Sequence, residues 1–331
     1  MKLTKPSYFD TFRCIASACP DSCCKEWDVA VDGEKAALYR SLPGALGQRL
    51  RQVLKEEEGQ TYMTIENGRC PMWRADGLCR IQAEVGEEAL CKTCREFPRL
   101  THDYGDFVEM GLELSCPEAA RLILSTPNPA VIEKSVPGGE EPEYDTEAME
   151  VLLRTRETMR HILADESDSV PQTLALALMY GYQAQGELDG EAEMPFHSKA
   201  ALESAVQFAV TGDTRPMLEF FQDLEILTGE WAACLKRPEP GPWMPEYRIL
   251  ARYFVDRYWL QAVSDYDLVG RVKLMLISCL MVKTLGGDMI GTAQLYSKEV
   301  ENSIDNLEAL LDGAYTDPAF TDNRLLGMLL L

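Results

Sequence analysis

The chain has 331 residues, of which 46% are hydrophobic and 26% are charged, and this composition is typical of a globular protein. The formal net charge of -22 makes a phosphate backbone an unfavourable partner, so we expect no binding to nucleic acid. Most of the negatively charged residues in excess over positive ones follow residue 125. They either form a solvated surface or attract a basic protein partner.

Neither a secretory signal nor a membrane span is expected. Residues 1–10 lack the apolar core of a signal peptide. The most apolar run, Leu274 to Val282, is too short to cross a bilayer and is interpreted as a buried helix. We therefore expect a cytoplasmic protein without a membrane partner, in a compartment that keeps cysteines reduced.

Residues 1–125 are predicted to form an irregular, cysteine-rich metal-binding domain with short helices and strands. Residues 1–33 show no regular pattern. Capping residues, prolines and alternating apolar residues predict the following elements: helices from Asp32 through Tyr39, from Ala45 to Glu58 and from Pro117 through Leu124, and strands at Thr61 to Ile65 and Phe107 to Leu114.

Residues 126–145 are predicted to be a linker, because prolines, glycines and acids cluster there. Residues 146–331 are predicted to form an acidic helical domain, because apolar residues recur at steps of three and four. The apolar end, Leu325 to Leu331, is expected to pack against this domain. The fold class is therefore mainly α. The predicted helices are Met149 to Leu163, Val170 to Gln185, Ser198 to Val210, Thr214 to Leu235, Pro245 to Val263, Leu268 to Leu285 and Ile290 to Leu311.

Nine of the 11 cysteines lie before residue 125 and are the candidate metal ligands. Thiolates are soft ligands that suit zinc and iron–sulfur clusters. The other two cysteines, Cys234 and Cys279, lie in helical patterns and are interpreted as buried small apolar residues. The nine candidates are Cys14, Cys19, Cys23 and Cys24 in a C-x4-C-x3-C-C pattern, Cys70 and Cys79, Cys91 and Cys94 in a C-x2-C pattern, and Cys116.

The predicted metal is an iron–sulfur centre, with zinc as the alternative and a metal-free set of reduced core cysteines as the plainest interpretation. The many thiols and the scarcity of histidine favour iron, and His102 is a weaker candidate ligand. The adjacent Cys23 and Cys24 indicate two nearby centres, or one ligand beside a bystander. Cys116 precedes a predicted helix, whose first N–H groups stabilise a thiolate.

Several segments carry these cysteines in a distinctive context. They are Phe12-Arg13-Cys14, Cys19-Pro20-Asp21-Ser22-Cys23-Cys24, Trp27, Val31-Asp32, Cys70-Pro71, Gly77-Leu78-Cys79-Arg80-Ile81, Gly86-Glu87, Leu90-Cys91, Cys94-Arg95-Glu96-Phe97-Pro98-Arg99 and Leu114-Ser115-Cys116-Pro117-Glu118-Ala119-Ala120. In order, spacing and flanking residues they resemble the flagellin lysine-N-methylase family, part of a wider group with a cysteine-rich, zinc- or iron-chelating domain. The resemblance covers roughly residues 8–125.

The resemblance implies a protein-lysine N-methyltransferase that uses S-adenosylmethionine, with flagellin as substrate and a metal or iron–sulfur centre on the matching cysteines. A protein with exposed lysines is then the expected partner, and an acidic surface suits it. A lysine ammonium must lose a proton before it can accept a methyl group. The candidate proton acceptors near the cysteines are Asp28, Asp32, Glu96 and Glu118, although such residues are more often caps or surface acids.

The alternative is a non-enzymatic metal-binding or redox-sensing module that docks a protein partner, or a structural zinc domain. The chain has no glycine-rich strand-to-helix loop of the kind that binds the methyl donor in Rossmann-like methyltransferases. The pair Gly286 and Gly287 is interpreted as a turn. The C-x3-C-x2-C spacing of radical S-adenosylmethionine proteins is also missing.

Overall fold

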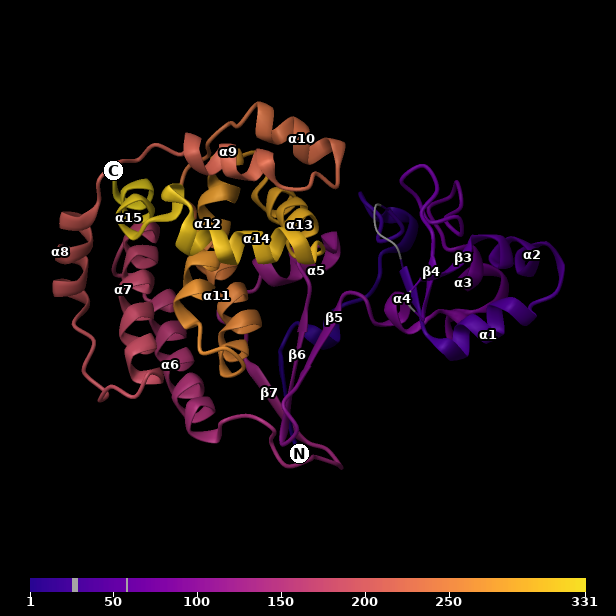
Figure 1. The fold of residues 1–331 in the computed structure, drawn as a ribbon, viewed down its shortest axis with the longest axis horizontal. Helices are drawn as coiled ribbons and strands as arrows, with labels where there is room; N and C mark the ends of the chain where they lie inside the picture. The colour runs from indigo at the N-terminus through magenta and orange to yellow at the C-terminus, as the bar shows by residue number, and fades with distance from the viewer. Residues whose placement is uncertain (26–28, 58) are drawn as a thin grey trace.

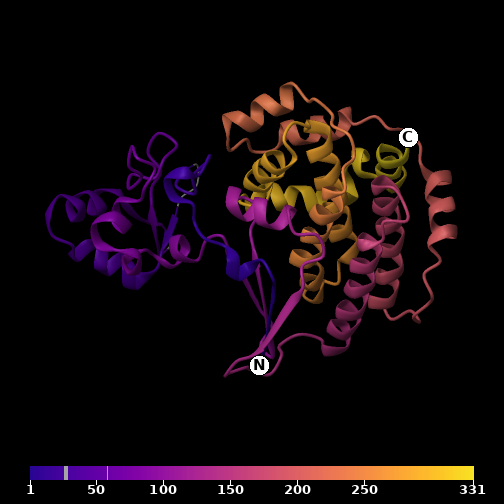
Figure 2. The ribbon, with the colours of Figure 1, turned by 180° about the vertical axis from the view of Figure 1, so that it is seen from behind.

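The computed structural model describes residues 1–25, 29–57 and 59–331. Figure 1 shows a small part, coloured indigo to purple, beside a larger helical part, and Figure 2 shows the same arrangement from behind. We call residues 13–98 the cysteine lobe. We call residues 1–12 and 99–331 the helical body. The lobe has a hydrophobic core of its own, and the core of the body draws on both of the body's segments.

The cysteine lobe combines a small antiparallel sheet with short helices. Its core holds the fully buried Tyr39 and Leu50 and also two thiols, those of Cys70 and Cys91. The helices are α1 (Gly33–Ser41), α2 (Gly44–Val53), α3 (Arg80–Val85) and α4 (Lys92–Glu96), with 3-10 helices η2 (Ala16–Ala18) and η3 (Glu87–Ala89). The strands are β2 (Val29–Val31), β3 (Leu54–Glu57) and β4 (Gln60–Met63), in the order β2-β4-β3.

A four-stranded sheet belongs to the helical body, and both ends of the cysteine lobe connect to its strands. Its strand order is β5-β6-β1-β7, with β1 parallel to β6 and antiparallel to β7. The strands are β1 (Lys2–Pro6), β5 (Arg99–Asp103), β6 (Phe107–Leu112) and β7 (Val131–Ser135). The chain leaves this sheet after β1, forms the lobe, and returns to the sheet at β5. The lobe is therefore an insertion between two strands of one sheet.

The helices of the body confirm the predicted mainly α fold class. The central one, α12 (Leu268–Leu285), is buried along nearly its whole length and contacts α7, α11, α13 and α14. The others are α5 (Pro117–Leu124), α6 (Thr146–Ala164), α7 (Val170–Leu188), α8 (Ser198–Phe208), α9 (Arg215–Asp223), α10 (Gly229–Lys236), α11 (Glu246–Tyr258), α13 (Met289–Val300), α14 (Ile304–Thr316) and α15 (Asp322–Leu330), with η1 (Phe9–Thr11), η4 (Trp259–Val263) and η5 (Pro318–Phe320).

Several sequence expectations are confirmed. Asp32 opens α1 by accepting a hydrogen bond from the Lys35 N–H. Gly286 and Gly287 both have positive φ and end α12 in a turn. The apolar C-terminal end forms α15, in which Leu325, Leu326 and Leu329 are buried against the body, whereas the terminal Leu331 is exposed. Cys279 is fully buried in α12, whereas Cys234 in α10 is half-buried.

Other expectations are wrong in detail. The helix predicted from Ala45 ends at Val53, because residues 54–57 pair with β4 as strand β3. The helix predicted over residues 214–235 is two helices, and so is the one predicted over residues 290–311. Residues 1–33 contain β1 and β2, and the predicted linker contains β7. The division into residues 1–125, 126–145 and 146–331 stays a prediction, because packing does not show which parts fold independently.

None of the helices in the described ranges combines the length and the apolarity that a membrane span needs.

Candidate functional site

The nine candidate ligands are free thiols that lie in two overlapping groups. All 11 cysteines fall within the described residues, and none forms a disulfide. In this part of the chain, no three side chains of His, Cys, Asp or Glu are arranged as a metal site. The thiols nevertheless act on one another electrostatically, and their mutual effects on the thiol pKa values show which of them are neighbours.

The first group joins the loop before β2 to the helical body. Burial raises the pKa of the Cys116 thiol to about 12, and the charges of Cys19 and Cys23 add to this rise. Burial likewise raises the pKa of Cys19, with contributions from Cys14 and Cys23. Cys116 lies more than 90 residues from the others in sequence, so the fold is what makes it a neighbour of Cys14, Cys19 and Cys23.

The second group lies inside the cysteine lobe. The contact with Cys23 lowers the pKa of the Cys24 thiol. The contact with Cys70 and burial raise it by more, so the net pKa is raised to about 12. In the C-x2-C pair, the contact between the thiols lowers the pKa of Cys91 and raises that of Cys94. Burial raises the pKa of Cys79, which feels the charges of Cys23 and Cys91. Cys23 therefore connects the two groups.

Three of the nine cysteines occupy the same local position, directly before the first residue of a helix. Cys79 precedes α3, Cys91 precedes α4 and Cys116 precedes α5. The N–H groups of Ala119 and Glu118 lower the pKa of Cys116, as expected for a helix N-terminus. Burial outweighs them, so the net pKa of the Cys116 thiol is raised, and its role as a metal ligand stays a prediction.

Asp21 ties the loop of the first group to α13. One carboxylate oxygen accepts a hydrogen bond from Lys25 at 2.9 Å, and the other accepts from Lys298 at 3.0 Å and from Gln294 at 3.2 Å. Burial raises the pKa of Asp21, but the two ammonium groups bring it below its ordinary value. Gln294 also donates to the Ser115 carbonyl oxygen at 2.7 Å, so α13 holds the residues on both sides of the first thiol group.

The chemistry of the nine thiols, rather than their arrangement in the described residues, suits a metal that prefers sulfur ligands. Nine thiols without disulfides lie in one connected network, and a cation can compensate the cost of ionising neighbouring buried thiols. His102 is not part of this network. It lies on β5, where burial and then the charge of Arg257 lower its pKa.

The candidate proton acceptors near the thiols have structural partners. Asp32 accepts from the Lys92 N–H at 2.8 Å and from the Lys35 N–H, and these bonds lower its pKa. Glu118 forms a bidentate pair with Arg121, which lowers its pKa. Glu96 is exposed at the end of α4, and Asp28, like Trp27, lies outside the described residues. The plain interpretation of Asp32 and Glu118 as a cap and a surface pair is confirmed.

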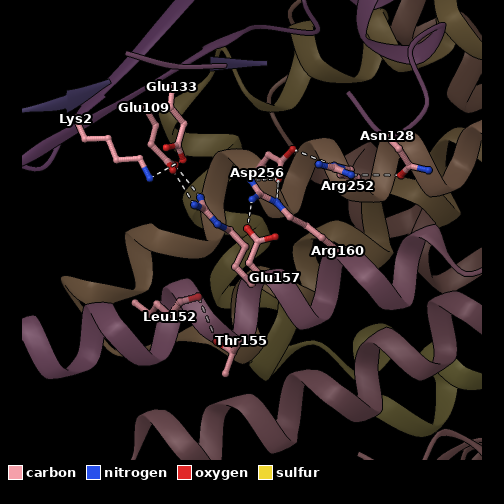
Figure 3. Close-up of polar contacts among 11 residues, drawn as sticks. Lys2, Glu109, Asn128, Glu133, Leu152, Thr155, Glu157, Arg160, Arg252 and Asp256 are labelled. Carbon is pink, nitrogen blue, oxygen red and sulfur yellow. Dashed lines mark hydrogen bonds and ion pairs between the residues drawn. The ribbon is translucent and has the colours of Figure 1, made fainter. Parts of the chain in front are cut away.

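A cavity of about 670 Å³ lies between the four-stranded sheet and helices α6 and α11. Sequence reasoning did not identify it, because its walls come from five separate segments. Figure 3 shows its polar contacts: Arg160 lies between Glu157 and Asp256, and Arg252 reaches Asp256 and Asn128. The distance from Arg160 to Asp256 is 2.6 Å, whereas Arg252 lies 3.4 Å from the same carboxylate.

Two further groups give the cavity its electrostatic character. Arg156 makes a bidentate pair with Glu109, with both N–O distances at 2.7 Å, and its side chain is almost fully buried. Burial raises the pKa of the Tyr8 hydroxyl, which lies near the charges of Asp256, Arg252 and Arg160. Within the described residues, the buried Nε2 of His102 and Nε of Arg156 have no hydrogen-bond partner.

Comparison with known proteins finds relatives for part of the chain. Over 133 residues it is 35% identical to the flagellar biosynthetic protein FliU of Salmonella muenchen, which covers 38% of this chain and 79% of FliU. Over 142 residues it is 34% identical to the Lysine-N-methylases of Salmonella typhimurium and Salmonella choleraesuis, which covers 40% of this chain but only 35% of each methylase. No family model and no solved structure matches.

Proposed function

We propose that this chain is a protein-lysine N-methyltransferase, because it belongs to the flagellin lysine-N-methylase family. The observation that carries the proposal is the similarity to two Lysine-N-methylases together with the match to most of FliU. We propose flagellin, or a similar protein with exposed lysines, as the substrate, S-adenosylmethionine as the methyl donor, and the cytoplasm as the location. The net charge of -22 supports a lysine-bearing partner.

The nine cysteines are proposed to hold an iron–sulfur centre, with zinc as the alternative. Their connected network supports this assignment, and its two groups favour two four-ligand sets. When bound, such a centre supplies strong cross-links between segments that are distant in sequence. The proposed sets are Cys14, Cys19, Cys23 and Cys116 between lobe and body, and four of Cys24, Cys70, Cys79, Cys91 and Cys94 within the lobe.

The reaction sets a simple requirement for the chain's own residues. The lysine nitrogen forms a bond to the methyl carbon while the carbon–sulfur bond of the donor breaks, and S-adenosylhomocysteine leaves. Before this step the ammonium must give its proton to an acceptor. We propose His102 for this role, because its lowered pKa favours the neutral imidazole and its Nε2 is not engaged by a described residue.

The direct test is methylation of purified flagellin by the metal-loaded protein under reducing, oxygen-free conditions. We expect mass spectrometry to find added methyl groups on lysines only when S-adenosylmethionine is present. His102→Gln should lower the rate and change its pH profile while metal content stays at the wild-type level. A wild-type protein that holds its full metal load but methylates neither flagellin nor another lysine-rich protein would contradict the proposal.

A metal-binding or redox-sensing module that docks a protein partner is the second candidate. One observation favours it: the sheets of the described residues are a mixed four-stranded sheet and an antiparallel three-stranded one. Neither is the doubly wound parallel sheet that carries the donor site in Rossmann-like enzymes. Such a module would retain its metal and bind a protein partner, but it would not bind S-adenosylhomocysteine.

A further inference from the structure

The cavity between the four-stranded sheet and helices α6 and α11 has the size and lining of a small-molecule site. Its volume of about 670 Å³ lies within the range of roughly 300–1,000 Å³ that ligand pockets occupy. Part of its wall is apolar, including Leu100, Phe107 and Leu153, and the rest is polar or charged. An apolar wall with a few convergent polar groups is the usual composition of a pocket that takes an organic ligand.

The charge of the lining differs from that of the whole chain. The protein has 54 acidic and 32 basic residues, yet the acidic and basic side chains that line the cavity are nearly balanced, six basic against five acidic. The basic ones are Lys2, Lys5, Arg156, Arg160, Arg252 and Arg257. A nearly balanced set of charges inside a strongly acidic protein provides cations for an anionic group and carboxylates for a cationic one.

Arg252 is the arginine best placed to bind an anionic group. Its polar contacts with described residues are long, at 3.4 Å to Asp256 and 3.3 Å to Asn128, whereas Arg160 and Arg156 hold their carboxylates at 2.6 and 2.7 Å. A guanidinium has five N–H donors in a fork that matches a carboxylate. Arg252 is also only slightly exposed, so water competes weakly for it.

The same wall also offers acceptors for a cationic group. Asp256 and Glu157 line the cavity beside the arginines, and the Tyr8 hydroxyl lies in the field of Asp256. A ligand that carries a carboxylate and an ammonium on one carbon uses both kinds of group, while a simple anion such as phosphate uses only the arginines. The buried nitrogens of His102 and Arg156, which bond to no described residue, add polar groups that a bound molecule can satisfy.

We propose that this cavity binds a small zwitterion through its carboxylate, with Arg252 as a principal contact. If the proposed function is correct, on which this identification of the ligand rests, the zwitterion is the methyl donor S-adenosylmethionine. Its amino-acid end matches the charged wall, and its nucleoside end matches the apolar wall. The cavity then replaces the glycine-rich loop that the sequence does not have.

The test is calorimetric titration of the metal-loaded full-length protein with S-adenosylhomocysteine, which keeps both ends of the donor but has no methyl group to transfer. Losing a hydrogen bond to a charged group costs about 1.5–3 kcal/mol, so Arg252→Gln should weaken binding by roughly 10- to 150-fold. Arg215→Gln is the control, because this exposed arginine on α9 pairs with Asp213 away from the cavity and should leave affinity unchanged.

Two shorter probes identify which end Arg252 recognises. Methionine, which carries only the amino-acid end, should bind more weakly to Arg252→Gln than to wild type. Adenosine should bind equally well to both. Tyr8→Phe keeps the shape of the wall and gives a second variant should Arg252→Gln be poorly folded; we expect weaker binding of S-adenosylhomocysteine here too.

The inference is overturned if the wild-type protein does not bind S-adenosylhomocysteine, or if folded Arg252→Gln and Tyr8→Phe bind it as tightly as wild type. The results can also distinguish a wrong donor site from a wrong proposed function. Methylation of flagellin with no effect of either variant on binding would keep the function and remove the cavity as the donor site. Binding that depends on Arg252, without methylation of any lysine, would keep the site and remove the function.

Discussion

The cysteine lobe and the helical body are stabilised in different ways. The body buries large side chains of many helices, including Trp259, Phe254 and Tyr296, in a continuous core around α12. The lobe has short helices, a three-stranded sheet and a small core that includes the thiols of Cys70 and Cys91. Burial of apolar surface sustains a large core, whereas a small one usually needs cross-links or a metal. From this comparison we predict that the body folds on its own packing and that the lobe depends on metal bound to its thiols.

The largest expected effect is that of metal removal. Because a structural metal site can contribute on the order of 10 kcal/mol to folding, stripping the metal with a chelator should unfold the lobe and leave the body folded. Hydrogen exchange followed by mass spectrometry measures this: amides of residues 29–91 should lose protection, while those of α11 and α12 keep it.

Single cysteine variants sharpen that test. Cys94→Ser should lower the metal content and the protection of the lobe together, because Cys94 belongs to the thiol network. Cys234→Ser is the matched control, since this half-buried cysteine of α10 lies outside the network. Equal protection of lobe and body after complete metal removal would show that the lobe folds without thiolate bonds.

The next effect concerns the ion pair that fixes the sheet of the body to α6. Arg156→Met leaves the Glu109 carboxylate without its bidentate partner in a largely buried place, which should cost about 3–5 kcal/mol. Urea unfolding measures the change. The double variant Arg156→Met with Glu109→Leu should recover most of the loss. Arg215→Met, at an exposed pair, should have no measurable effect. An equal loss in the double and single variants would mean that packing, not the unpaired charge, is responsible.

A pair of cavity-creating variants compares the two cores directly. Leu50 in the lobe and Leu276 in α12 are both fully buried, so replacing either with alanine should cost about 2–5 kcal/mol in its own region. Leu50→Ala should reduce metal retention and lobe protection, and Leu276→Ala should lower the unfolding midpoint of the body without loss of metal. Ile304→Ala, at a largely exposed position, is the control. If Leu276→Ala also releases the metal, the two regions unfold as one unit.

Sequence reasoning succeeded where local signals determine structure. The apolar period of the body predicted where most of its helices lie, and the Asp32 cap and the glycine pair after α12 were recognised from residue type alone. It failed at the break between α9 and α10, where apolar spacing continues. There the Leu227 N–H donates to Glu299 at 2.8 Å and the Glu225 N–H donates to Asn306 at 3.0 Å. Side chains more than 70 residues away end the helical pattern, and no local window contains them.

The candidate site shows the same limit. Cysteine type and spacing identified the thiols, because metal chemistry restricts the residues that can serve. The link from Asp21 to Lys298 spans 277 residues, and the cavity walls come from strands and helices far apart in the chain. The missed strands β1 and β7 pair with each other across about 130 residues, which neither short segment signals alone. Contacts of this kind follow from the assembled fold.

The smallest expected effect is a pH dependence that belongs to the body alone. Burial and the positive charges of Arg257 on α11 and Arg156 on α6 lower the pKa of His102, and Glu109 on β6 opposes them only in part. The folded state therefore disfavours the imidazolium. Its contribution to stability is complete above the unfolded pKa of about 6.5 and is lost as the pH falls through the lower folded pKa.

In urea titrations between about pH 8 and 5, His102→Gln should show a shallower loss of stability than wild type, with exposed His161→Gln as the control. Equal slopes for wild type and His102→Gln would mean that His102 gains its proton as easily in the folded as in the unfolded chain. That result would also weaken the proposed role of His102 as proton acceptor. The role requires a neutral imidazole, and an imidazole that gains its proton easily would be no better an acceptor than the candidate carboxylates Asp32 and Glu118, which serve as a helix cap and in a salt bridge.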